Sequence, residues 1–372
     1  MLFKDIIGLT DTKQALVRAV NHNHIAHAQL FDGGIGGASL AMALAFATYI
    51  NCEDKQDDDA CGRCSSCAKM SKFAHPDVHH IFPLPRSPKE NEDLLAELTP
   101  QWRSFIQQNP YRTLTEWLEF INATANQQGI LPIKEARSIV NKLTLKAFEG
   151  EYKIVVLWQP ELLNISAANA LLKILEEPPA KTLFLFVTNN ADKLLTTIIS
   201  RTQRVRIRAF TDEEVCEYLL KRNVEEKRAK QIAYLSEGNL SQAFQLIDHP
   251  DDDRHSWFAN WMRTSFRRDL VLLVKMADEF DGFTKEKQKG LFDYTLSLFR
   301  DLFLWQNGAE SLLRLEEEEL AFVKNFGKVI KTDALELLVH EITDAHYHLE
   351  RNARAKILFL DLSLTAVRAL RA

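Results

Sequence analysis

The fold of the chain is decided by the stretch Leu30-Phe31-Asp32-Gly33-Gly34-Ile35-Gly36-Gly37-Ala38-Ser39-Leu40. A short apolar strand at Gln29–Phe31 leads into this glycine-rich turn, and an alanine-rich helix follows it. Strand, glycine-rich turn and helix in this order are typical of a phosphate-binding (Walker A) loop, whose motif is GxxxxGK[ST]. Two further apolar runs, Lys153–Leu157 and Leu183–Thr188, have the length and composition of buried parallel strands. We therefore expect an α/β domain with a parallel sheet over residues 1–208.

This loop lacks the side chains that handle a nucleotide. The turn keeps glycines at Gly33, Gly36 and Gly37. After them the motif requires Gly, Lys and Ser or Thr, where the chain has Ala38, Ser39 and Leu40. The missing lysine would contact the β- and γ-phosphates, and the missing hydroxyl would hold magnesium. The sequence therefore predicts a degenerate loop that binds no ATP productively.

The acidic strand end that should complete such a site is altered as well. In an active site an aspartate at this place (Walker B) holds magnesium, and a neighbouring acid orients the attacking water. The strand at Lys153–Leu157 is followed instead by Trp158 and Gln159. Two separate parts of one site are lost together, and Trp158 is expected to pack into the space that a nucleotide would occupy.

Four of the five cysteines lie close together in the sequence, at Cys52, Cys61, Cys64 and Cys67. Four thiolates can surround zinc tetrahedrally, and C-x2-C turns bring pairs of sulfurs to the required distance. Such a shell leaves no position for water, so we expect a structural Zn²⁺ in a module at about residues 50–70. The alternatives are reduced thiols without a metal, or a histidine among His75, His79 and His80 in place of one cysteine. Cys216 stands alone and is expected to be a packing residue.

The remainder of the chain divides into three further parts. Residues of about 83–129 carry several prolines and a Trp- and Phe-bearing helix near Leu114–Ala125, and we interpret them as an insertion of unknown role. Residues 209–250 predict a small helical unit, with one helix capped by Thr211 and a second after Gly238-Asn239. A linker follows at His249–Asp253, and residues 251–372 have the amphipathic periodicity of an all-helical domain.

Charge and hydropathy narrow the class of protein. The formal net charge is −5, from 46 basic and 51 acidic residues, so any contact with nucleic acid should be local or made through partners. No apolar run approaches the roughly 18 residues that a membrane span needs, and no secretion signal is apparent. These features favour a cytoplasmic protein. Arg204, Arg206 and Arg208 share one face of a half-exposed strand, and they either contact DNA or a partner or form an ordinary solvated face.

Several motifs resemble those of the AAA+ subunits of the bacterial DNA polymerase III clamp loader. The run Ala167-Ala168-Asn169-Ala170-Leu171-Leu172-Lys173-Ile174-Leu175-Glu176-Glu177-Pro178-Pro179 looks like the signature helix of that family. The runs at 187–195 and 199–202, the start of the chain and the cysteine spacing extend the match in the expected order. The resemblance covers most of residues 1–245 apart from the insertion. It implies an AAA+ core at 1–208, a helical lid at 209–250 and a helical collar at 251–372 that holds the subunit in a ring.

The resemblance also implies a role for single residues. In this family a subunit without ATPase activity presents an arginine from an SRC motif to the nucleotide site of its neighbour. The motif stands here as Ser200-Arg201-Thr202, which makes Arg201 the candidate arginine finger acting in trans and leaves no role for a thiol. A guanidinium can meet the charge that develops on a transferring phosphoryl group. From the residues alone, an ion pair between Arg201 and a carboxylate at a strand end is the favoured interpretation, and the finger role depends on the resemblance. Active relatives carry a nucleotide-sensing lid arginine where this chain has Ser241.

The implied function is that of a subunit of the DNA polymerase III holoenzyme with no intrinsic activity, which helps to load the sliding clamp on primed DNA during DNA replication. Its implied partners are the ATPase subunits and the delta subunit of the clamp loader, the clamp itself indirectly, and primed DNA through the assembly. It would work at the bacterial replisome on the nucleoid, without a membrane. Two alternatives belong to other classes: an active AAA+ ATPase with an atypical loop, and a zinc-dependent hydrolase, which the all-cysteine ligand set disfavours.

Overall fold

The structure is a computed structural model that describes residues 1–85, 94–123, 129–132, 143, 147–248, 254–313, 315, 317–351 and 353–370. The chain forms two compact units, Met1–Ile247 and Asp248–Ala372. The predicted linker at His249–Asp253 lies outside the described residues. No described helix combines the length and the apolar character that a membrane crossing requires.

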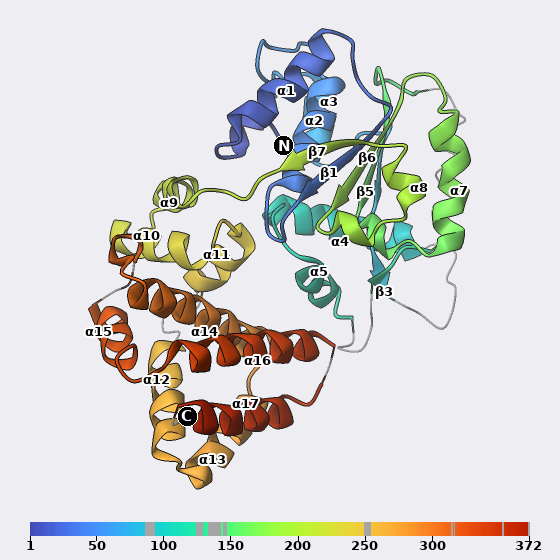
Figure 1. Ribbon diagram of the computed structural model, residues 1–372. Helices are drawn as coiled ribbons and strands as arrows, with labels where there is room; N and C mark the ends of the chain where they lie inside the picture. The colour runs from blue at the N-terminus through green and yellow to red at the C-terminus, as the bar shows by residue number, and fades with distance from the viewer. Residues whose placement is uncertain are drawn as a thin grey trace. The chain divides into compact units, whose positions relative to one another are not determined.

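The first unit is built on a sheet of five strands in the order β2-β5-β6-β1-β7 (Figure 1). The strands are β1 (Ala28–Gly33), β2 (Val78–Ile81), β5 (Lys153–Trp158), β6 (Thr182–Thr188) and β7 (Gln203–Ile207). Every pairing among them is parallel, so all carboxyl ends meet at one edge. The prediction of a parallel α/β sheet is confirmed, while β2 was not expected.

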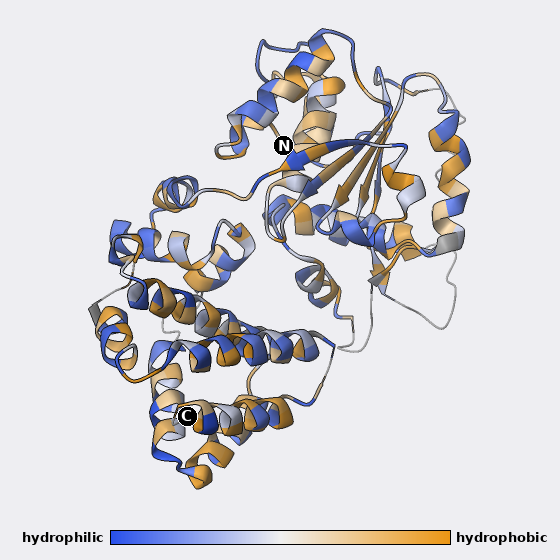
Figure 2. Ribbon diagram, in the orientation of Figure 1, coloured by the Kyte–Doolittle hydropathy of each residue, from blue (hydrophilic) through white to orange (hydrophobic). Residues whose placement is uncertain are grey.

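Alternate strand residues fill two separate cores, one on each face of the sheet. Phe31 and Val156 belong to the core that α2 (Ser39–Ile50) covers. Leu30 and Val155 belong to the other core, beneath α7 (Ile165–Glu176). Since both faces are covered, the strands are apolar along their length, as Figure 2 shows for the central ones.

The other elements of the core domain surround this sheet. They are η1 (Phe3–Asp5), α1 (Thr10–Asn21), α3 (Ser65–Ser71), η2 (Pro160–Leu162), η3 (Ala191–Lys193) and α8 (Thr196–Ile199). The expected insertion contains β3 (Leu84–Pro85), α4 (Leu94–Gln108), α5 (Leu114–Phe120) and β4 (Gly129–Ile130). β3 and β4 pair in antiparallel fashion. Residues 86–93 and 124–128 of the insertion lie outside the described residues.

The helical unit after the sheet has three helices, where the sequence predicted two. They are α9 (Asp212–Lys221), α10 (Glu226–Leu235) and α11 (Leu240–Asp248). Thr211 caps α9 as expected: its hydroxyl accepts from the Glu214 N–H at 3.2 Å, and the Glu214 carboxylate accepts from the Thr211 N–H at 2.9 Å. The break that the sequence did not reveal is at Asn223, whose left-handed φ of 63° ends the first helix without a glycine.

The described part of the second unit is helical, in agreement with the predicted all-helical region. Its elements are α12 (Arg254–Arg267), α13 (Leu270–Asp281), α14 (Lys285–Gln306), η4 (Glu310–Leu312), α15 (Glu317–Phe326), α16 (Thr332–Glu350) and α17 (Ala355–Ala369). Aromatic rings from several helices form its centre, where Trp261 lies 4.9 Å from Phe359 between ring centroids. The Trp261 indole N–H donates to Ser363 Oγ at 2.9 Å and so remains satisfied inside the core.

Candidate functional site

The glycine-rich loop is covered by the start of helix α11. Gly36 has a left-handed φ of 68°, and a Cβ built there would lie 1.7 Å from Asn239 Oδ1. Asn239 also accepts from the Gln242 N–H and thereby caps α11. The Leu240 N–H donates to the Gly36 carbonyl at 3.0 Å. Only glycine fits at Gly36, because the Asn239 side chain occupies the space that a Cβ would need.

The first turn of α2 carries no lysine or arginine that could bind a phosphate at the loop. Ser39, at the motif's lysine position, is 1% exposed, and its hydroxyl has no hydrogen-bond partner among the described residues. A Cβ at Gly33 would lie 2.5 Å from Ser39 Oγ, so this hydroxyl is packed against the end of β1. Leu40 takes the motif's hydroxyl position and is buried in the core, and Ala38 is buried as well. The degenerate residues therefore serve packing.

A carboxylate on α5 connects this helix to α11 within the first unit. Glu116 on α5 accepts from the Ser241 hydroxyl of α11 at 2.6 Å. The same carboxylate accepts from the Thr113 N–H and hydroxyl, at 2.6 and 2.8 Å, in a capping box. Ser241, where the resemblance predicted the loss of a nucleotide-sensing arginine, is thus buried beside this carboxylate. This contact could not be predicted from a local motif, since the two residues are 125 positions apart.

Trp158 lies in an aromatic cluster that the insertion supplies. Its ring centroid is 5.1 Å from that of Trp102 and 6.4 Å from that of Phe105, both on α4. Trp117 of α5 completes the cluster and donates its indole N–H to the Pro83 carbonyl at 2.8 Å. Trp158 is 2% exposed. The strand end that would carry a magnesium-binding acid is therefore buried among rings.

A network of polar side chains at the carboxyl ends of the strands hydrogen-bonds the glycine-rich loop. Asn189 donates to the Gly33 and Gly34 carbonyls at 3.2 and 2.9 Å, and Gln159 donates to Asn189. Glu161, which no sequence motif marks, accepts from the Thr188 hydroxyl at 2.9 Å. Burial raises the pKa of Glu161, although these donors oppose the shift. Gln159 and Asn189 thus hold the glycine-rich turn in place by neutral hydrogen bonds.

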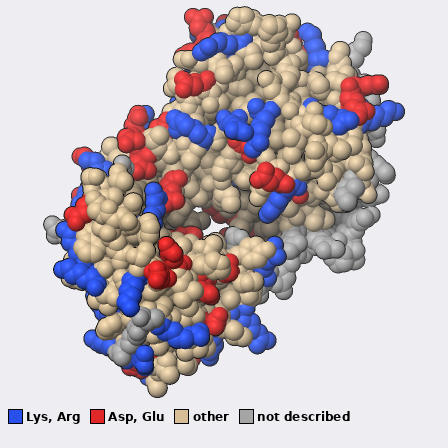
Figure 3. All heavy atoms as spheres, viewed as in Figure 1, with Lys and Arg blue, Asp and Glu red and all other residues tan. Residues whose placement is uncertain are grey.

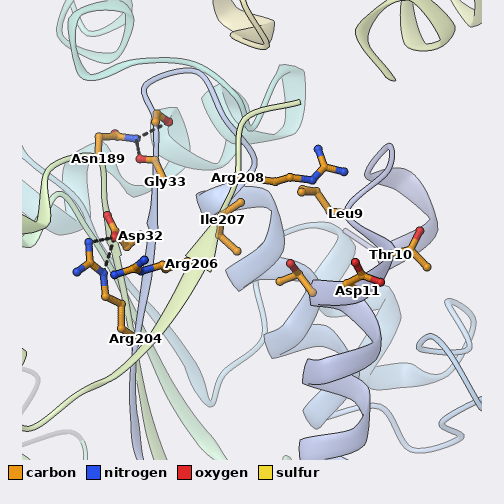
Figure 4. A pocket seen from close by; sticks show the side chains of 12 residues that line it. Leu9, Thr10, Asp11, Asp32, Gly33, Asn189, Arg204, Arg206, Ile207 and Arg208 are labelled. Atoms are coloured by element: carbon orange, nitrogen blue, oxygen red, sulfur yellow. Dashed lines mark hydrogen bonds and ion pairs between the residues drawn. The ribbon is translucent and has the colours of Figure 1, made fainter. Parts of the chain in front are cut away.

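A groove of about 700 Å³ opens between β1, β7 and the start of α1, and Figure 4 shows its lining. Arg204 donates to Asp32 at 2.6 Å, and Arg208 is held by both oxygens of Glu214. The arginine lowers the pKa of the Glu214 carboxyl group. Arg206 has no ion pair among the described residues. Two of these three arginines are therefore neutralised by carboxylates. Basic and acidic side chains also intermingle over the face drawn in Figure 3.

Arg201 lies near the amino-terminal ends of the strands, whereas the glycine-rich loop lies at their carboxyl ends. It precedes β7, whose first residue Gln203 is paired with Gln29 near the start of β1. The loop begins after Gly33, four residues further along, or about 13 Å at 3.3 Å per residue. The guanidinium donates to Glu176 from Nε at 3.0 Å and from Nη2 at 2.6 Å. Arg201 is thus remote from its own loop and paired with a carboxylate, while Ser200 and Thr202 flank it.

The four predicted cysteine ligands come together as one cluster. Their sulfur atoms all lie within 4.8 Å of one another, and Cys61 Sγ and Cys67 Sγ are 4.0 Å apart. Tetrahedral zinc with Zn–S bonds of about 2.3 Å places its sulfurs about 3.8 Å apart, so the arrangement fits this metal. Gly62 between two of them has a φ of 72°, which a side chain would strain. His75, His79 and His80 are not members of the cluster.

Backbone N–H groups favour the thiolate form of one of the four cysteines, Cys61. The N–H groups of Arg63 and Cys64 donate to Cys61 Sγ and lower the pKa of that thiol to about 7, whereas burial raises the pKa of Cys67. Bound zinc would cross-link residues 52–67 and leave no ligand position for water, so its chemistry would be structural. Cys216 lies outside the cluster, half-buried on α9.

The parallel sheet with its glycine-rich loop, the covering helices and the four-cysteine module define an AAA+-like domain, followed here by a helical region. A family model described as "DNA polymerase III, delta subunit" matches residues 8–211, more than half of the chain. The chain belongs to the DNA polymerase III delta' subunit family.

Individual relatives agree with this assignment. The chain is 25% identical over 331 residues to the DNA polymerase III subunit delta' of Yersinia pestis, which covers 87% of this chain and 83% of that protein. It is 24% identical over 309 residues to the delta' subunit of Bacillus subtilis, covering 80% and 78%. It is also 26% identical over 252 residues to the tau subunit of Bacillus subtilis, covering 66% of this chain. The chain spans only 37% of the length of that tau subunit.

Proposed function

We propose that the chain is a subunit of the DNA polymerase III clamp loader that hydrolyses no ATP and helps to load the sliding clamp on primed DNA during replication. Its relatives named delta' support the assembly, and the tau and gamma subunits among its other relatives support ATPase subunits as neighbours. The delta subunit, the clamp and primed DNA are the remaining expected partners. The site of action would be the replisome in the cytoplasm.

The observation that carries this proposal is the contact of the protein's own side chains with the loop that would bind a nucleotide. Asn239 packs on Gly36, so lid atoms lie directly above the turn that would cradle phosphates. Glu116 places a carboxylate beside the lid serine, where it would repel phosphate oxygens. No loop lysine compensates for this charge, and Trp158 replaces the magnesium-binding acid. An ATPase using an atypical loop would need all of these contacts to open.

The position of Arg201 supports a role in trans. Because Arg201 lies near the amino-terminal ends of the strands, its side chain does not reach the loop of its own chain. The side chain is 33% exposed and so accessible to a neighbour. An arginine supplied from outside to a phosphoryl-transfer site contributes about a thousandfold or more to the rate. Donation by Arg201 would make hydrolysis in the neighbour depend on assembly.

In this proposal, zinc bound by the four cysteines stabilises the fold of the first unit and takes no part in a reaction. Four cysteine sulfurs fill a tetrahedral shell, which leaves no open position for a hydrolytic water. This disfavours the zinc-dependent hydrolase. The helical second unit would supply the collar contacts of the ring.

The proposal is tested in a reconstituted clamp loader. Arg201→Ala should leave assembly intact by size-exclusion chromatography and strongly reduce the ATPase activity contributed by the adjacent site. Arg18→Ala removes an exposed arginine on α1 and serves as the matched control. Unchanged ATPase activity with Arg201→Ala would exclude the finger role, and failure of the wild-type chain to join tau or gamma and delta subunits would exclude the clamp-loader role.

A further inference from the structure

The side chain of Arg201 is held by groups from two different elements. Its Nε and Nη2 groups donate to Oε1 of Glu176, at 3.0 and 2.6 Å, at the end of α7. On its other side, Nη1 donates to the Thr197 carbonyl of α8 at 3.0 Å and to the Ser200 hydroxyl at 3.3 Å. Donors on both sides of the guanidinium are therefore engaged within the chain.

Glu176 binds the Nε–Nη2 side of the guanidinium, and an arginine commonly uses this side to bind an oxyanion. A guanidinium has five N–H donors, and its parallel N–H pairs match the oxygens of a carboxylate or a phosphate. The Nε–Nη2 pair is taken by Glu176, and Nη1 is directed to the Thr197 carbonyl. A phosphoryl group arriving from a neighbour would therefore compete with the Glu176 carboxylate.

We propose that Glu176 is a positioning residue that docks Arg201 in a resting position and releases it when the nucleoside triphosphate of a neighbouring subunit arrives. This inference rests on the proposed function of Arg201 in trans. The carboxylate stands in for the phosphate oxygens while the neighbouring site is empty. The strength of the Glu176–Arg201 contact then sets how readily the finger engages.

The surroundings of Glu176 make this contact reversible. The two side chains are 51% and 33% exposed, and exposed ion pairs contribute little stability. Glu176 is also the last residue of α7, where the helix dipole disfavours a negative charge. A neighbouring cation is therefore favourable at this carboxylate. Among the described residues, Glu176 accepts side-chain hydrogen bonds from Arg201 only. A buried pair in the same geometry would hold the arginine permanently.

Steady-state ATPase activity of the reconstituted clamp loader, measured against ATP concentration, tests the proposal. Glu176→Gln should weaken docking, increase the fraction of free Arg201 and lower the apparent KM for ATP by about 1.5- to 5-fold without lowering kcat. Glu176→Ala should shift KM in the same direction and by at least as much. Glu177→Gln removes the same charge at the next position, which is exposed and has no ion pair among the described residues, and should change neither constant.

The outcomes separate this inference from the proposed function. If Arg201→Ala reduces ATPase activity while both Glu176 variants keep the wild-type KM, docking is refuted and the finger role stands. If the Glu176 variants lower kcat, the carboxylate supports the engaged arginine, and the resting-position proposal is also wrong. If Arg201→Ala has no effect, the proposed function fails first. Melting temperatures equal to wild type establish that the exposed substitutions leave the fold intact.

Discussion

Replacing Trp158 by aspartate would restore the magnesium-binding acid in sequence, and we expect it to destabilise the first unit severely. The indole is 2% exposed, and its centroid lies 5.1 Å from that of Trp102. Truncating a buried tryptophan costs about 3–5 kcal/mol, and lost ring pairs are part of that loss. An unpaired carboxylate in the emptied space adds a few kcal/mol unless it becomes protonated. Since whole domains are stable by only about 5–15 kcal/mol, much of the unit's stability would be lost.

Urea denaturation, followed by circular dichroism, measures this effect. Trp158→Phe keeps an aromatic ring and should cost much less, while Phe148→Ala truncates a ring that is 83% exposed and should leave the midpoint nearly unchanged. A Trp158→Asp protein with the wild-type midpoint would contradict this prediction. It would show that the aromatic cluster does not depend on this ring.

Three other changes test separate parts of the structure. Asp77 accepts from the backbone N–H groups of residues 148–150 at 2.6 to 2.8 Å, so Asp77→Asn should cost about 1–3 kcal/mol in urea denaturation. Burial alone would raise the pKa of Asp77, but the three N–H donors lower it below its ordinary value of 3.8. The stabilisation by Asp77 is therefore present above pH 3.8 and is lost as the pH falls through the lower pKa of the folded state. An acid titration of both proteins would detect this loss. Cys61→Ser should abolish zinc in elemental analysis and lower the melting temperature, whereas Cys216→Ser should retain the metal. Glu116→Ala should cost about 1–2 kcal/mol and speed amide exchange at the start of α11; unchanged exchange there would contradict the lid contact.

The parallel sheet could be predicted because its strands carry a local signal. Lys153–Trp158 and Thr182–Thr188 are apolar without interruption, since helices cover both faces of the sheet. Val78–Ile81 escaped prediction because two histidines interrupt the apolar pattern of this edge strand. The cysteine cluster was accessible for the opposite reason, since the ligands themselves form the motif.

The covering of the loop was not accessible from local patterns. The missing lysine and acids are visible in the sequence, but what fills their place depends on contacts between distant segments. Glu116 and Ser241 give no local signal for their hydrogen bond, and the packing of Trp158 on Trp102 depends on how the insertion returns to the sheet. The same holds for Arg201 and Glu176, whose ion pair follows from where two helices end.

We propose that this polypeptide neither binds nor turns over ATP and that it lends a guanidinium to a neighbouring subunit. The decisive measurement is phosphate release by the purified chain at millimolar ATP with magnesium, with tau or gamma added in a second series. We expect background release from the chain alone and stimulated release when the ATPase subunits assemble with it. Steady release by the isolated chain, abolished by a substitution in its own glycine-rich loop, would contradict the account.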